Sequence, residues 1–320
     1  MDFIQNYSYN KMIKDLENEG IATPPDLDPI ELPEDAILNF IAWGDPQVSS
    51  VAPHRAANFT AGCRDLKNMK GKLDAIVLLG DVAEFGRECE YKLASEILND
   101  VGDKFDKFFA VTGNHDIRLR NHKKQMAKFN SFIRSVDGGV VGSDEHYYFS
   151  YEIKGCKFIF MGSDYTALEG EFLSREQLKM VDREITDAEK RNMPVFVFNH
   201  QTLRDTNGLP EVWTGRPNTR GSVGFQSDSV LHIFEKHKNT IFVTGHLHYG
   251  VCRINYEDCG CFKALSVPTI GATNHGTADM PAQGYIISVF EDRIEIRARI
   301  HSQGRYFEEG HVNSFITIKR

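Results

Sequence analysis

Apolar runs of strand length alternate along the first part of the chain with stretches of helical length. Residues 36–43, 73–79 and 107–112 are rich in apolar side chains and end in polar or glycine-containing turns, which is typical of buried strands. The intervening residues 53–70 and 87–101 suit helices. Repeated strand-then-helix units predict parallel strands with crossover helices on the faces of the sheet.

The alternation continues in the second half of the chain. Strands are predicted at 146–153, 156–162, 193–198 and 240–244, and helices at 174–191 and 226–238. From residue 250 the apolar runs become short, and residues 281–320 are typical of antiparallel strands. The pattern therefore predicts an α/β fold with mixed sheets, forming a single domain over residues 36–320.

Residues 1–35 follow a different pattern. A polar segment is succeeded by an acidic, proline-rich run that contains Pro24, Pro25, Pro29 and Pro33. Proline fixes the backbone in an extended form and removes an amide donor, so an N-terminal arm that leads into the domain is expected.

Composition and charge exclude several classes of protein. The 320 residues are 41% apolar and 26% charged, as in ordinary globular proteins, and the net charge of −8 argues against a broad face for long nucleic acid. No stretch approaches the roughly 20 apolar residues of a membrane span. The first residues also lack the basic start and apolar middle of a signal peptide, so we expect a cytoplasmic protein without a membrane partner.

Polar side chains that can bind metals follow five of the predicted strands. Ligands bind at the carboxyl ends of strands in open α/β sheets, so these side chains are expected to meet at one edge. They are Asp45 and Gln47, Asp81, Asn114 and His115, His200, and His246 with His248. Each turn alone is more often structural, but their coincidence at five strand ends favours a metal site.

The donor types indicate which cations would fit. Carboxylates, amide oxygens and neutral imidazoles suit manganese, iron or zinc, and the absence of cysteine from the set argues against structural zinc. Two divalent or trivalent ions roughly 3.5–4 Å apart need one bridging carboxylate. Asp81 lies in the middle of the ordered set and is the natural candidate.

Five sequence blocks resemble the signature of the calcineurin-like metallophosphoesterases. In chain order they are Asp45-Pro-Gln47, Gly80-Asp81, Gly113-Asn114-His115-Asp116, Asn199-His200 and Gly245-His246-Leu-His248. The resemblance implies a four-layer α/β/β/α sandwich with two mixed β-sheets. It also implies a dinuclear centre that hydrolyses phosphoric esters through a metal-bound hydroxide.

The resemblance further implies a role for each position. Asp45, Gln47, Asp81 and His248 would hold the first metal, and Asp81, Asn114, His200 and His246 the second. His115 would be the catalytic proton donor or charge stabiliser, and Asp116 would orient its ring. For the substrate, a small phosphorylated molecule or a phosphodiester, Asn114, His115, Arg118 and Arg204 are candidate contacts.

Gln47 departs from the family pattern, in which the first block reads Asp-x-His. A glutamine oxygen is a weaker donor than imidazole toward zinc or iron(II), so we expect a looser first site, or one that favours manganese or iron. Two alternatives stay open: a phosphodiesterase acting on nucleotides, and a catalytically weak scaffold or binding protein that retains the fold. The oligomeric state does not follow from the pattern.

Overall fold

The computed structural model describes residues 28–49, 51–118, 120–166, 168–209, 221–272 and 282–320. Most of the expected N-terminal arm, residues 1–27, lies outside these ranges. The remainder of the arm packs on the domain: the Asp28 amide donates to the Gly304 carbonyl at 2.9 Å, and the Ile30 side chain is fully buried. No helix among the described residues is long and apolar enough to cross a membrane.

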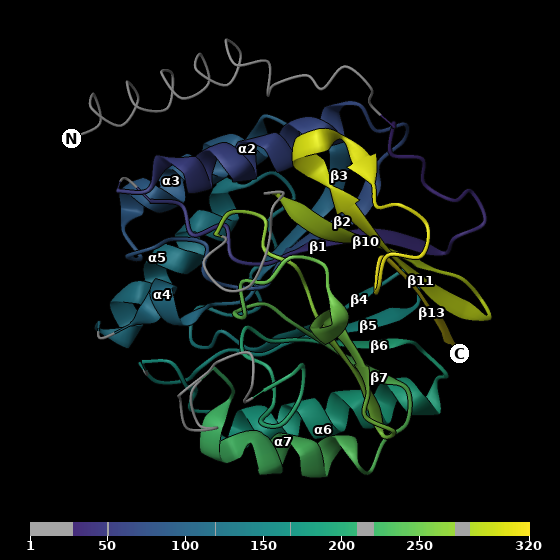
Figure 1. The fold of residues 1–320 in the computed structure, drawn as a ribbon. Coiled ribbons are helices and arrows are strands. Elements are labelled where there is room, and N and C mark those ends of the chain that lie inside the picture. Colours follow the sequence, from purple (N-terminus) through teal and green to yellow (C-terminus); the bar gives the residue numbers. More distant parts are fainter. Residues whose placement is uncertain (1–27, 50, 119, 167, 210–220, 273–281) are drawn as a thin grey trace.

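Two mixed sheets form the centre of the molecule (Figure 1). The first has the order β12-β11-β10-β1-β2-β3, with β13 also paired to β11. Its strands are β1 (Leu38–Trp43), β2 (Leu73–Leu78), β3 (Phe105–Ala110), β10 (Gln283–Val289), β11 (Arg293–Ile300), β12 (Arg305–Tyr306) and β13 (Phe315–Lys319). The C-terminal strands β10 to β13 are antiparallel, as predicted, and complete the sheet that the N-terminal strands begin.

The second sheet has the order β4-β5-β6-β7-β9-β8. Its strands are β4 (Phe149–Ile153), β5 (Cys156–Phe160), β6 (Val195–Phe198), β7 (Thr240–Thr244), β8 (Tyr256–Asp258) and β9 (Phe262–Ser266). Strands β5, β6, β7 and β9 run parallel, and β4 and β8 pair antiparallel at the edges.

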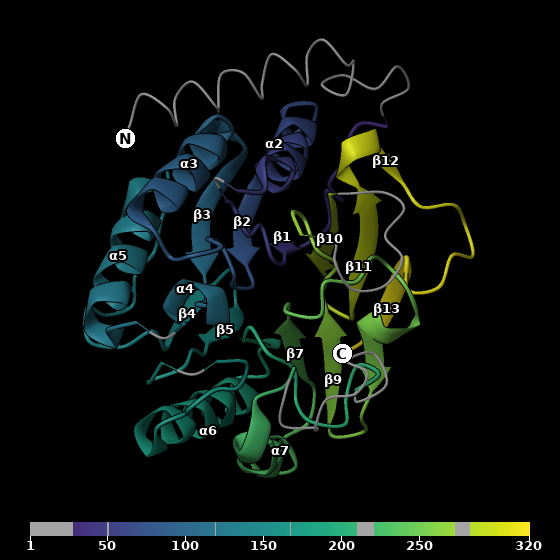
Figure 2. The same cartoon turned by 60° about the vertical axis from the view of Figure 1, so that its left-hand side comes forward.

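Helices cover the outer face of each sheet (Figures 1 and 2). The first sheet is covered by α2 (Pro53–Lys67), α3 (Glu88–Asn99) and α5 (His122–Ser135), and the second by α6 (Arg175–Lys190) and α7 (Ser227–Phe234). The expected α/β/β/α sandwich is confirmed. Helix α5 and the single turn α4 (Asn114–Ile117) are not among the elements that the apolar pattern predicts.

The central strands have uninterrupted apolar sequences because both of their faces are buried. Along β1, Phe40 points between the sheets while the next residue, Ile41, points to the helices. The Phe40 ring meets Phe158 of β5 and Phe196 of β6 edge-on, with centroids 5.0 and 5.1 Å apart. Aromatic contacts of this kind join the two sheets, so the ends of strands from both sheets are held at fixed positions.

Some element bounds differ from those predicted. Strand β3 is Phe105–Ala110 instead of 107–112, because Val111 and Thr112 already belong to the turn that precedes the next motif. Strand β4 begins at Phe149 and α7 ends at Phe234, so both are shorter than predicted. Propensity does not define such boundaries well, because tertiary pairing decides where a strand ends.

A buried polar network fixes the end of β1. Arg299 is fully buried and its guanidinium binds the Asp65 carboxylate of α2 through two hydrogen bonds of 2.5 and 2.7 Å. The His301 Nδ1 lies 2.7 Å from the same carboxylate, and the Trp43 indole donates to His301 Nε2 at 3.0 Å. Since Trp43 is two residues before Asp45, this network supports the strand end on which the candidate site begins.

Candidate metal centre

The structure brings all seven predicted metal ligands to one edge of the sandwich. Asp45 and Gln47 follow β1, Asp81 follows β2, and Asn114 follows β3, whereas His200 follows β6 and His246 and His248 follow β7. All seven are buried, with at most 5% of each residue exposed. Carboxylate and amide donors therefore come from the first sheet and imidazoles from the second.

The backbone of five of these seven residues is in the left-handed region. The φ angles are 54° at Asp45, 41° at Gln47, 48° at Asp81, 69° at His246 and 55° at His248. A residue with a Cβ atom adopts this conformation at a cost of about 1–3 kcal/mol, and such strain concentrates at functional sites. The backbone at these strand ends is therefore strained, and its conformation sets the positions of these side chains in the site.

Two glycines allow the loops to approach one another. A Cβ at Gly80 would lie 2.5 Å from His200 Nδ1, and a Cβ at Gly113 would collide with the Asp81 side chain and amide. The Gly113 position lets the β3 loop lie directly against Asp81, whose Oδ1 accepts a hydrogen bond of 2.7 Å from the His115 amide. Glycine is required at both positions for steric reasons.

Potential ligand atoms form two groups that share one aspartate. Ligand atoms of Asp81, His200 and His246 lie within 4.8 Å of one another, and so do those of Asp45, Asp81 and His248. The aspartates and histidines of the two ligand sets implied by the sequence resemblance divide in the same way, while Gln47 and Asn114 belong to neither group. Asp81 is the member common to both groups, as a bridging carboxylate must be.

The donors around His200 have the arrangement that a cation needs. Its Nδ1–H donates to the Leu79 carbonyl at 2.6 Å, so Nε2 faces the site. This Nε2 lies 3.1 Å from Asn114 Oδ1, 3.3 Å from Asp81 Oδ2 and 3.0 Å from His246 Nδ1. Burial lowers the pKa of His200, but the Asp81 carboxylate raises it to about 10 overall. The atoms around His200 Nε2 therefore stabilise a positive charge at the point toward which they are directed.

Gln47 also fits a metal ion. Its Oε1 atom is buried and has no hydrogen-bond partner among the described residues. An unsatisfied buried acceptor costs about 1–3 kcal/mol, so such an atom needs an explanation. Coordination of a cation by this amide oxygen would remove the penalty, which supports Gln47 as a ligand despite its departure from the family pattern.

The contacts of the His115 ring differ from those expected. The ring does not contact the Asp116 carboxylate: Nδ1 donates to the Glu84 carbonyl at 3.0 Å and lies 3.5 Å from Glu84 Oε1. Glu84 in turn forms an ion pair with Arg55 of α2. Glu84, which the sequence analysis missed, therefore orients the His115 ring and directs Nε2 toward Arg118.

Asp116 instead holds the loops that carry the candidate ligands. Its carboxylate accepts hydrogen bonds from the amides of Ala83 and Gly113 at 3.0 and 2.9 Å, and from the Tyr91 hydroxyl at 3.1 Å. Burial and the neighbouring charge of Asp81 raise the pKa of Asp116 to about 7. The short turn α4 directs this side chain back toward the backbone, so proximity to His115 in sequence is misleading.

The two predicted arginine contacts differ in position. Arg118 lies at the site, with Nη2 donating to His115 Nε2 at 3.1 Å and to Glu169 Oε1 at 3.0 Å. Arg204 is held by carboxylates instead: it contacts Asp228 of α7 at 2.6 Å and Asp205 at 3.5 Å. These two contacts occupy the Arg204 guanidinium in this structure, and its role as a substrate contact stays a prediction.

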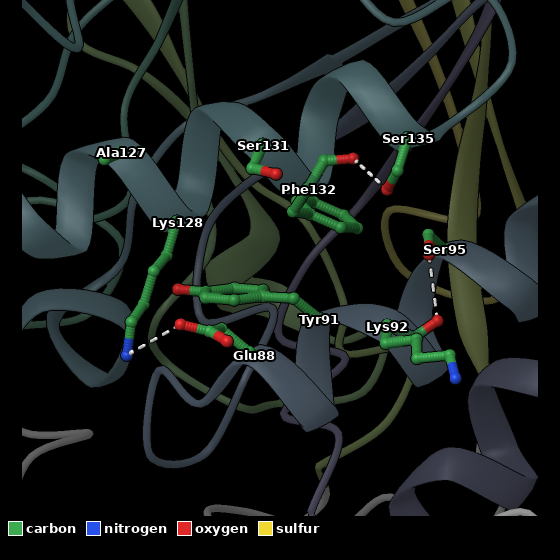
Figure 3. A pocket seen from close by; sticks show the side chains of 9 residues that line it. All are labelled: Glu88, Tyr91, Lys92, Ser95, Ala127, Lys128, Ser131, Phe132 and Ser135. Atoms are coloured by element: carbon green, nitrogen blue, oxygen red, sulfur yellow. Dashed lines mark hydrogen bonds and ion pairs between the residues drawn. The ribbon is translucent and has the colours of Figure 1, made fainter. Parts of the chain in front are cut away.

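A separate groove of about 510 Å³ lies between α3 and α5, away from the candidate ligands (Figure 3). The Tyr91 ring stacks under Phe132 in its floor, with centroids 5.4 Å apart, and Lys128 faces Glu88 across its mouth. Among the described contacts, one hydrogen bond links the groove to the site: the Tyr91 hydroxyl donates to Asp116.

Comparisons with known proteins identify the family and the fold. A model of the calcineurin-like phosphoesterase family matches residues 39–250. The fold resembles a dimetal phosphatase from Danio rerio, with a TM-score of 0.65 and 12% identity over 89% of this chain and 99% of that one. It also resembles purple acid phosphatase PPD1 from yellow lupin seeds, with a TM-score of 0.62 and 14% identity over 88% and 54%. Comparison with curated protein sequences gave no match.

Proposed function

Because the chain belongs to the calcineurin-like phosphoesterase family, we propose that it hydrolyses phosphoric esters at a dinuclear metal centre built around Asp81. The observation that carries this proposal is the pair of ligand groups with Asp81 in common. Asp45, Gln47, Asp81 and His248 would hold one cation. Asp81, Asn114, His200 and His246 would hold the other.

A metal pair lowers the pKa of bound water and neutralises charge on the phosphoryl oxygens, which are the two requirements of ester hydrolysis. The protein's own residues supply the rest. The Glu84 carbonyl accepts a hydrogen bond from Nδ1–H of His115, so Nε2 is the nitrogen that would face the leaving oxygen. It can give a proton to that oxygen, or stabilise its charge, when the ring carries a proton on both nitrogens. Arg118 Nη2 lies 3.1 Å from the same nitrogen and is also paired with Glu169.

A small phosphorylated molecule or a phosphodiester is the proposed substrate class. The net charge of −8 gives the protein little attraction for the backbone of long nucleic acid. Manganese, iron or zinc is the proposed metal, because the site combines oxygen donors with three imidazoles.

Metal-dependent turnover tests the proposal. Chelated protein would be reloaded with Mn²⁺, Fe²⁺ or Zn²⁺ and assayed with p-nitrophenyl phosphate and bis(p-nitrophenyl) phosphate. We expect turnover that disappears on chelation and returns on reloading. The Asp81→Ala variant should lose metal and activity, whereas Asp103→Ala, which removes an exposed aspartate, should retain both. A wild-type protein that binds two metals and cleaves neither ester would instead be a scaffold.

A further inference from the structure

The segment between β5 and α6 brings a carboxylate to the substrate side of the candidate centre. Glu169 Oε1 lies 3.0 Å from Arg118 Nη2, and Glu169 Oε2 accepts a hydrogen bond of 3.2 Å from Asn114 Nδ2. Its backbone carbonyl accepts another from Gln201 Nε2 at 3.3 Å. The Glu169 side chain is 29% exposed, and its two carboxylate oxygens contact Arg118 and Asn114.

Glu169 occupies the donors that a phosphoryl group would use. The Arg118 guanidinium flanks His115, and the Asn114 amide belongs to the proposed ligand set. Phosphate oxygens bind to such guanidinium and amide N–H groups. A phosphoryl group at the centre would therefore lie close to a fixed negative charge that competes for the same hydrogen bonds.

The positive charges beside His115 are already balanced. Arg55 is paired with Glu84 and Arg118 with Glu169. Among the described residues, these two arginines add no net positive charge around the ring. A substrate with two negative charges would gain little from them, because Glu169 cancels the attraction that Arg118 would otherwise provide.

We propose that Glu169 is a specificity-determining residue that disfavours dianionic phosphate monoesters and so selects monoanionic phosphodiesters. The inference rests on the proposed function. A monoester approaches two negative charges at neutral pH because its second pKa is about 6, whereas a diester carries only one. Repulsion by a fixed charge grows with the charge of the ligand, so Glu169 acts as negative selection against the monoester.

The same segment offers a surface for the second organic group of a diester. Tyr165, Leu168 and Phe172 are exposed to 65%, 53% and 53%, and the rings of Tyr165 and Phe172 meet edge-on with centroids 6.5 Å apart. Large apolar side chains left in solvent beside a site are typical of a contact surface for an apolar or aromatic group. A monoester has one organic group fewer to place there.

Neutralising Glu169 tests the inference. Metal-loaded full-length Glu169→Gln would be compared with wild type for kcat/KM on p-nitrophenyl phosphate and on bis(p-nitrophenyl) phosphate. We expect the monoester-to-diester ratio to rise about tenfold or more. Inorganic phosphate, measured by titration calorimetry, should bind about tenfold more tightly to the variant at neutral pH.

Two further variants separate charge from other effects. Glu169→Asp keeps the charge and should keep the wild-type ratio. Glu176→Gln removes one exposed carboxylate in the first turn of α6 and should leave both the ratio and phosphate binding unchanged. Metal content and melting temperature would be measured for each protein, so that a folding or metal defect is recognised.

Opposite results would overturn the inference. An unchanged ratio in Glu169→Gln, or an equal loss on both esters together with metal loss, would show that Glu169 only supports Asn114. If the wild type cleaves no ester with any metal, the proposed function fails. In that case phosphate binding still tests Glu169, since unchanged affinity in Glu169→Gln would refute its role.

Discussion

His115 is the residue whose contacts define a chemical role most closely. Its Nδ1–H is committed to the Glu84 carbonyl, so a proton for the leaving oxygen would come from Nε2 of the doubly protonated ring. We expect His115→Ala to keep both metals and to lose about 10²–10⁴-fold in turnover, because it removes one positioned proton donor. Alkyl phosphate esters should lose more than p-nitrophenyl esters, whose leaving group needs no proton. Steady-state rates with parallel metal analysis measure this, and near-wild-type rates on the alkyl ester would contradict the assignment.

We expect Gln47 to limit the strength of the first metal site. Its amide oxygen is a weaker donor than imidazole toward zinc, although the atom is buried in a suitable place. Replacement by histidine, Gln47→His, should increase the zinc that each chain retains after dialysis. Elemental analysis of the dialysed proteins checks the prediction. Two tightly held zinc ions in the wild type would show that the amide oxygen is not limiting.

At the residue scale, the sequence pointed to the candidate metal ligands more readily than to the carboxylates that contact His115, Asn114 and Arg118. The seven candidate ligands stand directly after apolar strands, so their position follows from local pattern. Glu84 and Glu169 lie in irregular segments, and each reaches the site through tertiary contacts with residues 31 and 55 positions away. No periodicity encodes such contacts, and adjacency to His115 pointed to Asp116 instead.

At the element scale, the β3–α4 turn must lie against Asp81. A methyl group at Gly113 would collide with the Asp81 side chain and amide. Gly113→Ala should therefore push the two loops apart, lower the melting temperature and abolish metal retention. Gly155→Asn is a suitable control, because a Cβ there meets nothing within 4 Å and asparagine tolerates its φ of 76°. Full metal content in Gly113→Ala would refute this packing argument.

The network that joins α2 to β11 predicts an acid-sensitive contribution to stability. Burial alone would raise the pKa of Asp65, but hydrogen bonds from Arg299 and His301 outweigh it and hold the pKa below the usual 3.8. The unfolded chain therefore binds the proton more readily. The stabilisation should be complete above pH 4 and should be lost as the pH falls toward the folded pKa.

The Asp65→Asn variant tests the same network. It leaves the buried Arg299 without its counter-charge, at an expected cost of about 3–5 kcal/mol in the free energy of unfolding at neutral pH. Urea unfolding between pH 3 and 7 measures the effect. The difference between variant and wild type should shrink toward pH 3, and a difference independent of pH would contradict it.

The strands themselves could be predicted because both faces of each central strand are buried. Continuous apolar runs then mark the element, as in β2 and β6, whose residues are all buried. Helix α5 was not predicted, since its sequence contains three lysines and one arginine and has few apolar positions per turn. Its buried side chains, including Phe129 and Ile133, meet the sheet only once the chain has folded.

At the scale of the whole molecule, bound cations should stabilise the sandwich. Both sheets donate to the candidate centre, so a cation that binds only the folded state raises the free energy of unfolding by RT ln(1 + [L]/Kd), about 2.7 kcal/mol at a hundredfold excess over Kd. Chelation should lower the melting temperature, and Mn²⁺ or Zn²⁺ should restore it. The Asp81→Ala variant should show no such shift; an equal shift in this variant would place the bound metal elsewhere.

The division of oxygen and nitrogen donors between the two sheets also bears on which metal ion we expect the site to bind. Every oxygen donor follows a strand of one layer, and every nitrogen donor follows a strand of the other. Magnesium or calcium, which prefer oxygen ligands, would bind only the donors of one layer and leave the imidazoles of the other layer without a metal. An ion that accepts both kinds of donor would bind both layers, so we expect the site to favour such an ion over magnesium or calcium.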